Sequence, residues 1–107
     1  MEKAEQIVVF ITAGTQDEAQ NIARILLDER KVACVNIVSG VESLFWWQGE
    51  IDKATEYLLI AKSEVTLLEQ IVDTVKKAHS YKVPEVIALP IIGGNRDYLE
   101  WIRSELR

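Results

Sequence analysis

The sequence predicts an α+β fold of the ferredoxin-like class, a βαββαβ chain whose antiparallel sheet carries helices on one face. Two observations predict it. Apolar runs with strand character alternate with segments of helical periodicity in that order, and a short helix follows at the C-terminus. The chain has 107 residues, 49% of them apolar, which is enough for one packed domain over residues 1–107 and hardly enough for two.

The first half of the chain supplies a strand, a helix and a long second strand. Residues 6–13, QIVVFITA, form an apolar, β-branched run that is typical of a buried strand. Thr15 and Glu18 have the spacing of a capping box, and apolar residues at helical spacing extend the next helix to about Arg30. Residues 32–47 then return to strand character.

The second half is expected to add a strand, a helix and a last strand. Residues 50–54 are polar enough to predict a turn, and residues 55–62, TEYLLIAK, indicate the third strand. Thr66 begins a second capping-box pattern, with Glu69 three residues later, ahead of an apolar helical face. The apolar run at residues 85–92 indicates the fourth strand.

Two prolines and one asparagine predict where helices and strands begin and end in the C-terminal third of the chain. Pro84 favours an extended residue before it and so ends the second helix. Pro90 has no N–H to donate, which predicts an edge strand or a bulge. Asn95 can cap the final helix, whose apolar face is expected to include Tyr98 and Trp101.

Three aromatic residues, Phe45, Trp46 and Trp47, stand together near the end of the second strand. Since successive strand residues point to opposite faces, the triplet makes both faces apolar. A straight strand over residues 32–47 would span roughly 50 Å, too long for a domain of this size, so it must bend at Gly40 or project beyond the sheet. We interpret the triplet as an oligomer contact on a long hairpin; the alternative is a core wrapped around the hairpin within one subunit.

Composition narrows the classes of partner and location. The net charge of −5 disfavours sequence-independent binding to nucleic acid, and it also disfavours binding to an acidic membrane surface. No run of 18 apolar residues predicts a membrane-spanning helix. The single cysteine, Cys34, rules out an internal disulfide, and the N-terminal residues lack a signal-peptide layout, so a cytoplasmic location is expected.

Five segments carry a family pattern in the right order and spacing. They are ACVNI (33–37), SLFWWQGEI (43–51), TEYLLIAKS (55–63), HSYKVPEVIALPI (79–91) and YLEWI (98–102). Together they resemble the CutA family, the divalent-cation tolerance proteins, over nearly the whole chain. The resemblance implies a ferredoxin-like subunit assembled through long hairpins as a homotrimer. It also implies a cytoplasmic protein linked to tolerance of divalent metals, copper especially, with no firmly attached enzymatic activity.

The resemblance also carries the family's recurrent residues onto this chain. They fall on Cys34, Asn36, Ser43, Trp47, Gly49, Glu56, Lys62, His79, Tyr81, Pro84, Glu85, Tyr98 and Trp101. Two departures bear on metal binding: a second histidine and a cysteine of some members are Ala78 and Ile11 here, which argues against a copper site built from that fuller set.

Cys34 and His79 are the candidate metal ligands. A thiol is a soft ligand and a neutral imidazole is the commonest one, so Cu²⁺ or another divalent cation is the expected ligand, and no cofactor is required. One histidine cannot close a structural zinc site, so His79 would join Cys34, Glu85 or the histidines of other copies. The alternatives stay open: Cys34 as a small buried apolar residue, and His79 as a structural residue at a helix C-terminus.

Four residues are candidates for a small-molecule cleft between subunits: Glu56, Lys62, Tyr81 and Glu85. Glu56 and Lys62 are six residues apart in one predicted strand and so share a face. They would take a cation and an anion, respectively, or form an ion-pair network at the subunit contact. The loop carrying Tyr81 and Glu85 would wall the crevice.

The first hypothesis is therefore a homotrimeric binding or regulatory protein, with weak divalent-metal binding, and not an enzyme. A PII-like small-molecule signalling module without a metal role is the first alternative. An acylphosphatase-type hydrolase is the second, but it needs an arginine in the loop after the first strand, and Arg24 lies inside the predicted helix. An RNA-binding sheet would need stacking aromatics in a basic surround, and the first strand offers only Phe10.

Overall fold

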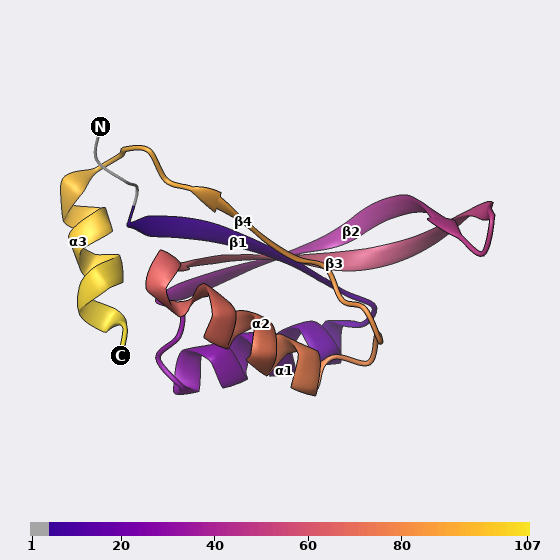
Figure 1. Ribbon diagram of the computed structural model, residues 1–107, viewed down its shortest axis with the longest axis horizontal. Helices are drawn as coiled ribbons and strands as arrows, with labels where there is room; N and C mark the ends of the chain where they lie inside the picture. Colours follow the sequence, from indigo (N-terminus) through magenta and orange to yellow (C-terminus); the bar gives the residue numbers. More distant parts are fainter. Residues whose placement is uncertain (1–4) are drawn as a thin grey trace.

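The computed structural model describes residues 5–107; the first four residues of the predicted domain lie outside the described part. Figure 1 shows the chain as a layered α+β fold with one long projecting arm. Its elements are β1 (Gln6–Ala13), α1 (Gln16–Asp28), β2 (Cys34–Trp47), β3 (Glu50–Glu64), a 3₁₀ turn (Val65–Leu67), α2 (Leu68–Ala78), β4 (Val86–Pro90) and α3 (Arg96–Glu105).

The four strands form one antiparallel sheet in the order β2-β3-β1-β4. The helices α1 and α2 lie side by side on one face of this sheet, and α3 lies at the end away from the projecting arm (Figure 1). This arrangement confirms the ferredoxin-like prediction. Pro90 ends β4, an edge strand, as its missing N–H predicts.

The core lies between the sheet and the two covering helices. Alternate residues of β1, namely Ile7, Val9 and Ile11, are buried on the helix side of the sheet. They pack in one cluster with Ile22 and Leu26 of α1, which lie four residues apart on one helical face. The apolar residues whose spacing predicts β1 and α1 are therefore the residues that form the core.

Only one of the two predicted capping boxes forms a cap. The Thr15 hydroxyl accepts a hydrogen bond from the backbone N–H of Glu18 at 3.1 Å and caps α1. The prediction at Thr66 is wrong, because β3 continues to Glu64 and the next three residues form a 3₁₀ turn. α2 therefore begins at Leu68, without a side-chain cap.

The predicted turn at residues 50–54 is also wrong. Gln48 and Gly49 turn the chain by themselves, with positive φ angles of 51° and 82°, and β3 begins at Glu50. Positive φ at both central residues is the geometry of a tight two-residue hairpin, which needs no further turn residues.

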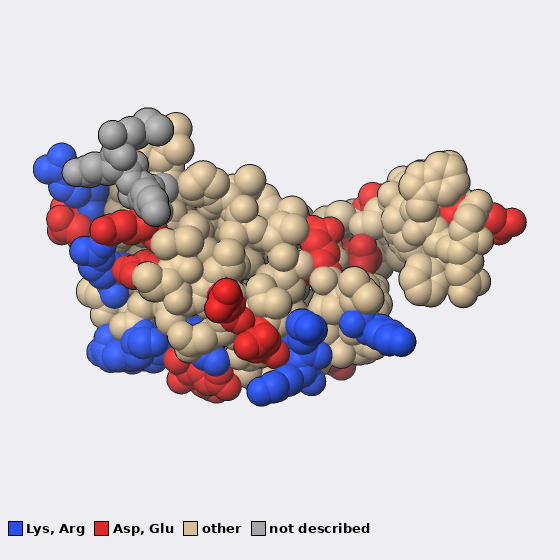
Figure 2. Space-filling model, viewed as in Figure 1, with Lys and Arg blue, Asp and Glu red and all other residues tan. Residues whose placement is uncertain are grey.

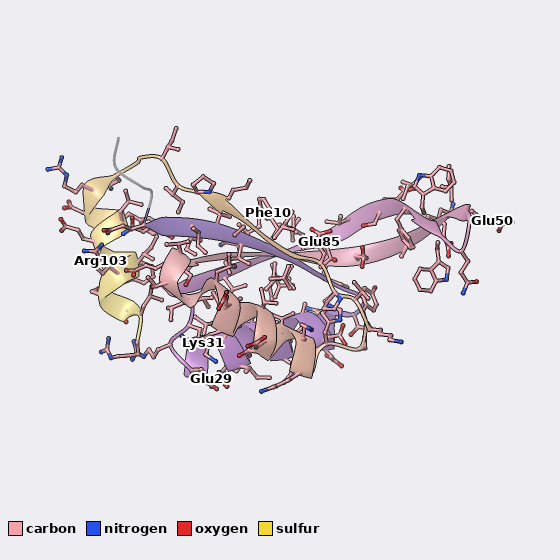
Figure 3. All side chains as sticks on the ribbon, viewed as in Figure 1. Phe10, Glu29, Lys31, Glu50, Glu85 and Arg103 are labelled. Carbon is pink, nitrogen blue, oxygen red and sulfur yellow. The ribbon has the colours of Figure 1, made fainter. Side chains whose placement is uncertain are left out.

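The bend predicted at Gly40 is confirmed. The pairing of β2 with β3 shifts register between Val38 and Val41, and Gly40 has a φ angle of 72°, which favours glycine. Beyond this bulge the hairpin runs clear of the other strands (Figure 1). Glu50 lies at the far end of the hairpin, and Arg103 of α3 lies at the other end of the molecule (Figure 3).

Candidate functional site

The hairpin tip carries a group of exposed apolar side chains. Trp46 is 74% exposed and Trp47 is 59% exposed. We call the following set the hairpin tip: Leu44, Phe45, Trp46, Trp47 and Ile51. Figure 2 shows this end of the molecule as a largely uncharged knob. No wrapped core covers the tip among the described residues, so the alternative of a core around the hairpin within one subunit is wrong.

The face of the sheet opposite α1 and α2 is apolar and uncovered. Phe10 of β1 points away from the helices (Figure 3), and strand pairing places every second residue of the neighbouring strands on the same side. We call this surface the open sheet face; it comprises Val8, Phe10, Val38, Leu58, Ile60, Ile87 and Leu89. Ile87 and Leu89 are both about half exposed.

A group of polar side chains, which we call the lysine cluster, lies at the α3 end of the open sheet face. It comprises Lys62, Cys34, Asn36 and Tyr98. Cys34 is the strand partner of Lys62, and its Sγ atom lies 4.0 Å from the Lys62 Nζ atom. Lys62 also donates a hydrogen bond to the Asn36 side-chain oxygen. Cys34 is half-buried beside charged and polar groups.

Tyr98 and Trp101 share one face of α3, as their spacing predicts, and both are only partly buried in the single chain. Each is 41% exposed, and Ile102 is the buried residue of this helix. Their rings are 5.5 Å apart between centroids. Burial, followed by the neighbouring Cys34 side chain, raises the pKa of the Tyr98 hydroxyl above its usual value, so this group remains a hydrogen-bond donor.

Glu56 is a buried carboxylate with a hydroxyl partner. The Tyr81 hydroxyl donates a hydrogen bond to the Glu56 Oε2 atom at 2.9 Å. Burial, then the hydrogen bond and charge of Glu56, and then the charge of Glu18, raise the pKa of Tyr81 to about 12. A Cβ atom at Gly14 would lie 3.0 Å from the Tyr81 hydroxyl, so the glycine admits this contact.

Glu56 and Lys62 share a face of β3, as their spacing predicts, but they do not pair. Six residues of strand separate them by roughly 20 Å, and each has other partners. Glu85 is exposed and lies just before β4. One chain therefore does not gather Glu56, Lys62, Tyr81 and Glu85 into a single cleft.

His79 is buried, and both of its ring nitrogens contact backbone groups. Its Nε2 atom lies 2.6 Å from the carbonyl oxygen of Thr12, which can only accept, so this nitrogen carries the proton. Its Nδ1 atom accepts a hydrogen bond from the Tyr81 N–H at 3.0 Å. The imidazole thus holds the chain after α2 against β1.

Glu18 contacts the same turn in a way that sequence reasoning missed. One oxygen of this carboxylate accepts a hydrogen bond from the Ser80 N–H at 3.0 Å. The other lies 3.5 Å from the His79 Nδ1 atom and, among the described residues, has no hydrogen-bond partner. The capping-box spacing predicted Glu18 as a partner of its own helix, and no local signal indicated this reach across to the second helix.

Cys34 and His79 lie towards opposite ends of β1. Cys34 pairs with Lys62, and Lys62 pairs with Val8 of β1. His79 contacts Thr12 of β1. Val8 and Thr12 are about 13 Å apart along this strand. Within residues 5–107 there is no group of three or more His, Cys, Asp or Glu side chains that could hold a metal ion. The structure thus does not bring the two predicted ligands together in one chain, and their metal role stays a prediction.

These features define a ferredoxin-like α+β protein with a projecting hairpin and an uncovered apolar sheet face. The chain belongs to the CutA1 divalent ion tolerance protein family, whose family model matches residues 7–105. The resemblance seen in its sequence motifs is thereby confirmed. None of the helices among residues 5–107 has the length and apolar character of a membrane-spanning segment.

Relatives and solved structures agree with this assignment. The chain is 46% identical to the rice protein CutA 1, chloroplastic, over 101 residues, covering 94% of this chain and 57% of that protein. It therefore spans little more than half of that relative. A solved divalent cation tolerance protein from Thermus thermophilus has a TM-score of 0.94 at 43% identity, covering 95% of this chain and 99% of the other. A periplasmic CutA from Archaeoglobus fulgidus has a TM-score of 0.92 at 38% identity, with 95% and 99% covered.

Proposed function

We propose that this chain is a homotrimeric binding or regulatory protein in divalent-cation tolerance, and not an enzyme. The observation that carries the proposal is the pair of uncovered apolar surfaces, the open sheet face and the hairpin tip. Exposed apolar surfaces of this extent mark sites of association. Relatives of this chain are named for tolerance of divalent cations and not for a catalysed reaction, which supports the functional part of the proposal.

Other copies of the chain are the partners that we propose for these surfaces. β2 is an edge strand, so its outer backbone groups are free to pair, and an exposed apolar edge is a liability unless it is covered. The aromatic triplet at residues 45–47 lies at the end of that edge. Three copies, as the family resemblance implies, would cover the sheet faces and tips together.

Acrylamide quenching of tryptophan fluorescence tests this burial. In a Trp101→Phe variant, the remaining tryptophans are Trp46 and Trp47, both in the hairpin tip. We expect their fluorescence to be shielded from acrylamide in the assembled protein. Quenching as efficient as that of a free tryptophan derivative would contradict the proposed contact.

Divalent-metal binding is proposed at the contacts between copies. No group of three donor side chains lies together in residues 5–107 of one chain, so a closed site needs donors from more than one copy. Glu56 is the buried carboxylate best placed to contribute an oxygen. Both His79 nitrogens are already hydrogen-bonded, which disfavours His79 as a ligand unless this turn opens.

Calorimetric titration with Cu²⁺ and Zn²⁺ separates these donors. Glu56→Gln, Cys34→Ser and His79→Gln each remove one predicted ligand. A loss of affinity in Glu56→Gln and not in Glu42→Gln, a matched control on exposed β2, would support Glu56. Wild-type protein that binds neither ion would remove the metal role and leave the PII-like signalling alternative.

The acylphosphatase-type alternative needs an arginine in the loop after β1. Arg24 lies on α1 and pairs with Asp28 at 3.3 Å, so it does not supply that loop arginine.

A cytoplasmic location stays a prediction, since relatives are named chloroplastic in one case and periplasmic in another. Cell fractionation tests it directly, and recovery with the periplasmic fraction would contradict it.

A further inference from the structure

Lys62 is a half-buried cation whose charge has no opposite charge beside it. It lies near the end of β3, an inner strand of the sheet, between Val8 of β1 and Cys34 of β2. None of the ion pairs among residues 5–107 involves Lys62. The carboxylate two residues along the same face, Glu64, is engaged by Arg103 at 3.3 Å.

An anion can supply the opposite charge that this partly buried ammonium group lacks. Removing a charged group from water is costly unless an opposite charge and hydrogen bonds replace the water. The partners of Lys62 in this chain are the Asn36 amide oxygen and the Cys34 sulfur, and neither is a carboxylate. An anion is therefore the group that completes the cluster.

Two neighbours add recognition elements to this charge. The Tyr98 hydroxyl is protonated at neutral pH, as a phenol ordinarily is, and so it can donate to an anion; burial and the adjacent Cys34 raise its pKa further above the usual value. The Tyr98 and Trp101 rings, 5.5 Å apart and each 41% exposed, present a flat apolar surface beside the cluster. A planar group can lie against such aromatic rings.

We propose that the lysine cluster binds the carboxylate of a small ligand with a planar apolar body, which lies on Tyr98 and Trp101. One ammonium group balances a single negative charge, whereas a phosphate dianion would need further cations. The protein's net charge of −5 also disfavours polyanions. This inference deepens the proposed binding role and rests on it.

Calorimetric titration of the assembled protein with benzoate tests the site, with benzamide as a neutral ligand of the same shape. We expect benzoate to bind and benzamide not to. Lys62→Met should weaken benzoate binding about tenfold or more, the loss expected for a charged hydrogen-bonding partner. Lys53→Met, the same change at an exposed position of the same strand, should leave binding unchanged. Trp101→Ala should weaken binding through the lost aromatic surface.

Three results would overturn the proposal: no benzoate binding by wild type, equal binding by Lys62→Met, or equal binding of benzamide. Protein that assembles and binds metal but ignores benzoate would lose only this inference and keep the proposed function.

Discussion

The Tyr81 hydroxyl donates a hydrogen bond to the buried Glu56 carboxylate across 2.9 Å. This bond joins the turn after α2 to β3, close to the bulge where the hairpin leaves the sheet. The backbone N–H of the same tyrosine donates to His79, which in turn donates to Thr12 of β1. These linked contacts position Glu56, which lies where the hairpin leaves the sheet and is the only buried carboxylate among the described residues.

The Tyr81–Glu56 contact predicts a loss of stability at high pH. The pKa of Tyr81 is about 12 in the folded chain and 10.0 without these contacts, so the folded state favours the neutral hydroxyl. That stabilisation is complete below about pH 10 and is lost as the pH rises towards 12. Urea unfolding across this range should show a steeper fall in the free energy of unfolding for wild type than for Tyr81→Phe. Tyr57→Phe is the control, and an equal effect there would rule out the contact as the cause.

Gly14 should tolerate a methyl group poorly because of the same tyrosine. A Cβ atom at this position would lie 3.0 Å from the Tyr81 hydroxyl, so in Gly14→Ala this hydroxyl should move by a few tenths of an ångström and its hydrogen bond to Glu56 should weaken. We expect a cost of about 0.5–1.5 kcal/mol in the free energy of unfolding, the net contribution of one hydrogen bond. Gly94→Ala, where a Cβ atom would meet nothing within 4 Å, is the matched control. In a Tyr81→Phe background the cost of Gly14→Ala should shrink; an undiminished cost would contradict this explanation.

His79 should be a single tautomer. The Thr12 carbonyl and the Tyr81 N–H require the proton on Nε2 and a lone pair on Nδ1. Because the chain contains one histidine, ¹⁵N NMR of the imidazole reports this residue alone. Replacing it with alanine should leave backbone groups unsatisfied, at about 1–3 kcal/mol each. A proton found on Nδ1 would contradict the assigned contacts.

Trp47→Ala should weaken association through the hairpin tip. Trp47 is 59% exposed in one chain, so its removal should cost little within the subunit and more between subunits. We expect the midpoint of urea unfolding to depend on protein concentration more strongly in the variant than in wild type. Ile92→Ala removes an exposed apolar side chain away from the tip and is the control. Equal behaviour of the two variants would show that the tip is no special contact.

The sequence predicts elements well where periodicity and core coincide, as in β1 and α1. It fails at residues 50–54, because both faces of the projecting hairpin are exposed and a polar run is then compatible with a strand. At α3 the helical spacing shows that Tyr98 and Trp101 share a face, but it does not show how deeply each apolar residue is buried: Ile102 is fully buried and the two aromatic residues are each 41% exposed.

The candidate sites show the same division between local and long-range information. The alternation of β3 places Glu56 and Lys62 on one face, and the structure agrees. Their actual partners come from distant segments: Tyr81 from the turn after α2, and Cys34 and Asn36 from β2. Strand register and loop path decide such contacts, and neither is written in the spacing of the residues within one strand.

Light scattering after gel filtration measures most directly whether other copies of the chain cover the open sheet face and the hairpin tip. Three subunits should give a particle of three times the chain mass of 12.2 kDa, stable on dilution. A folded particle of 12.2 kDa would contradict the account, because both apolar surfaces would then face water without a partner.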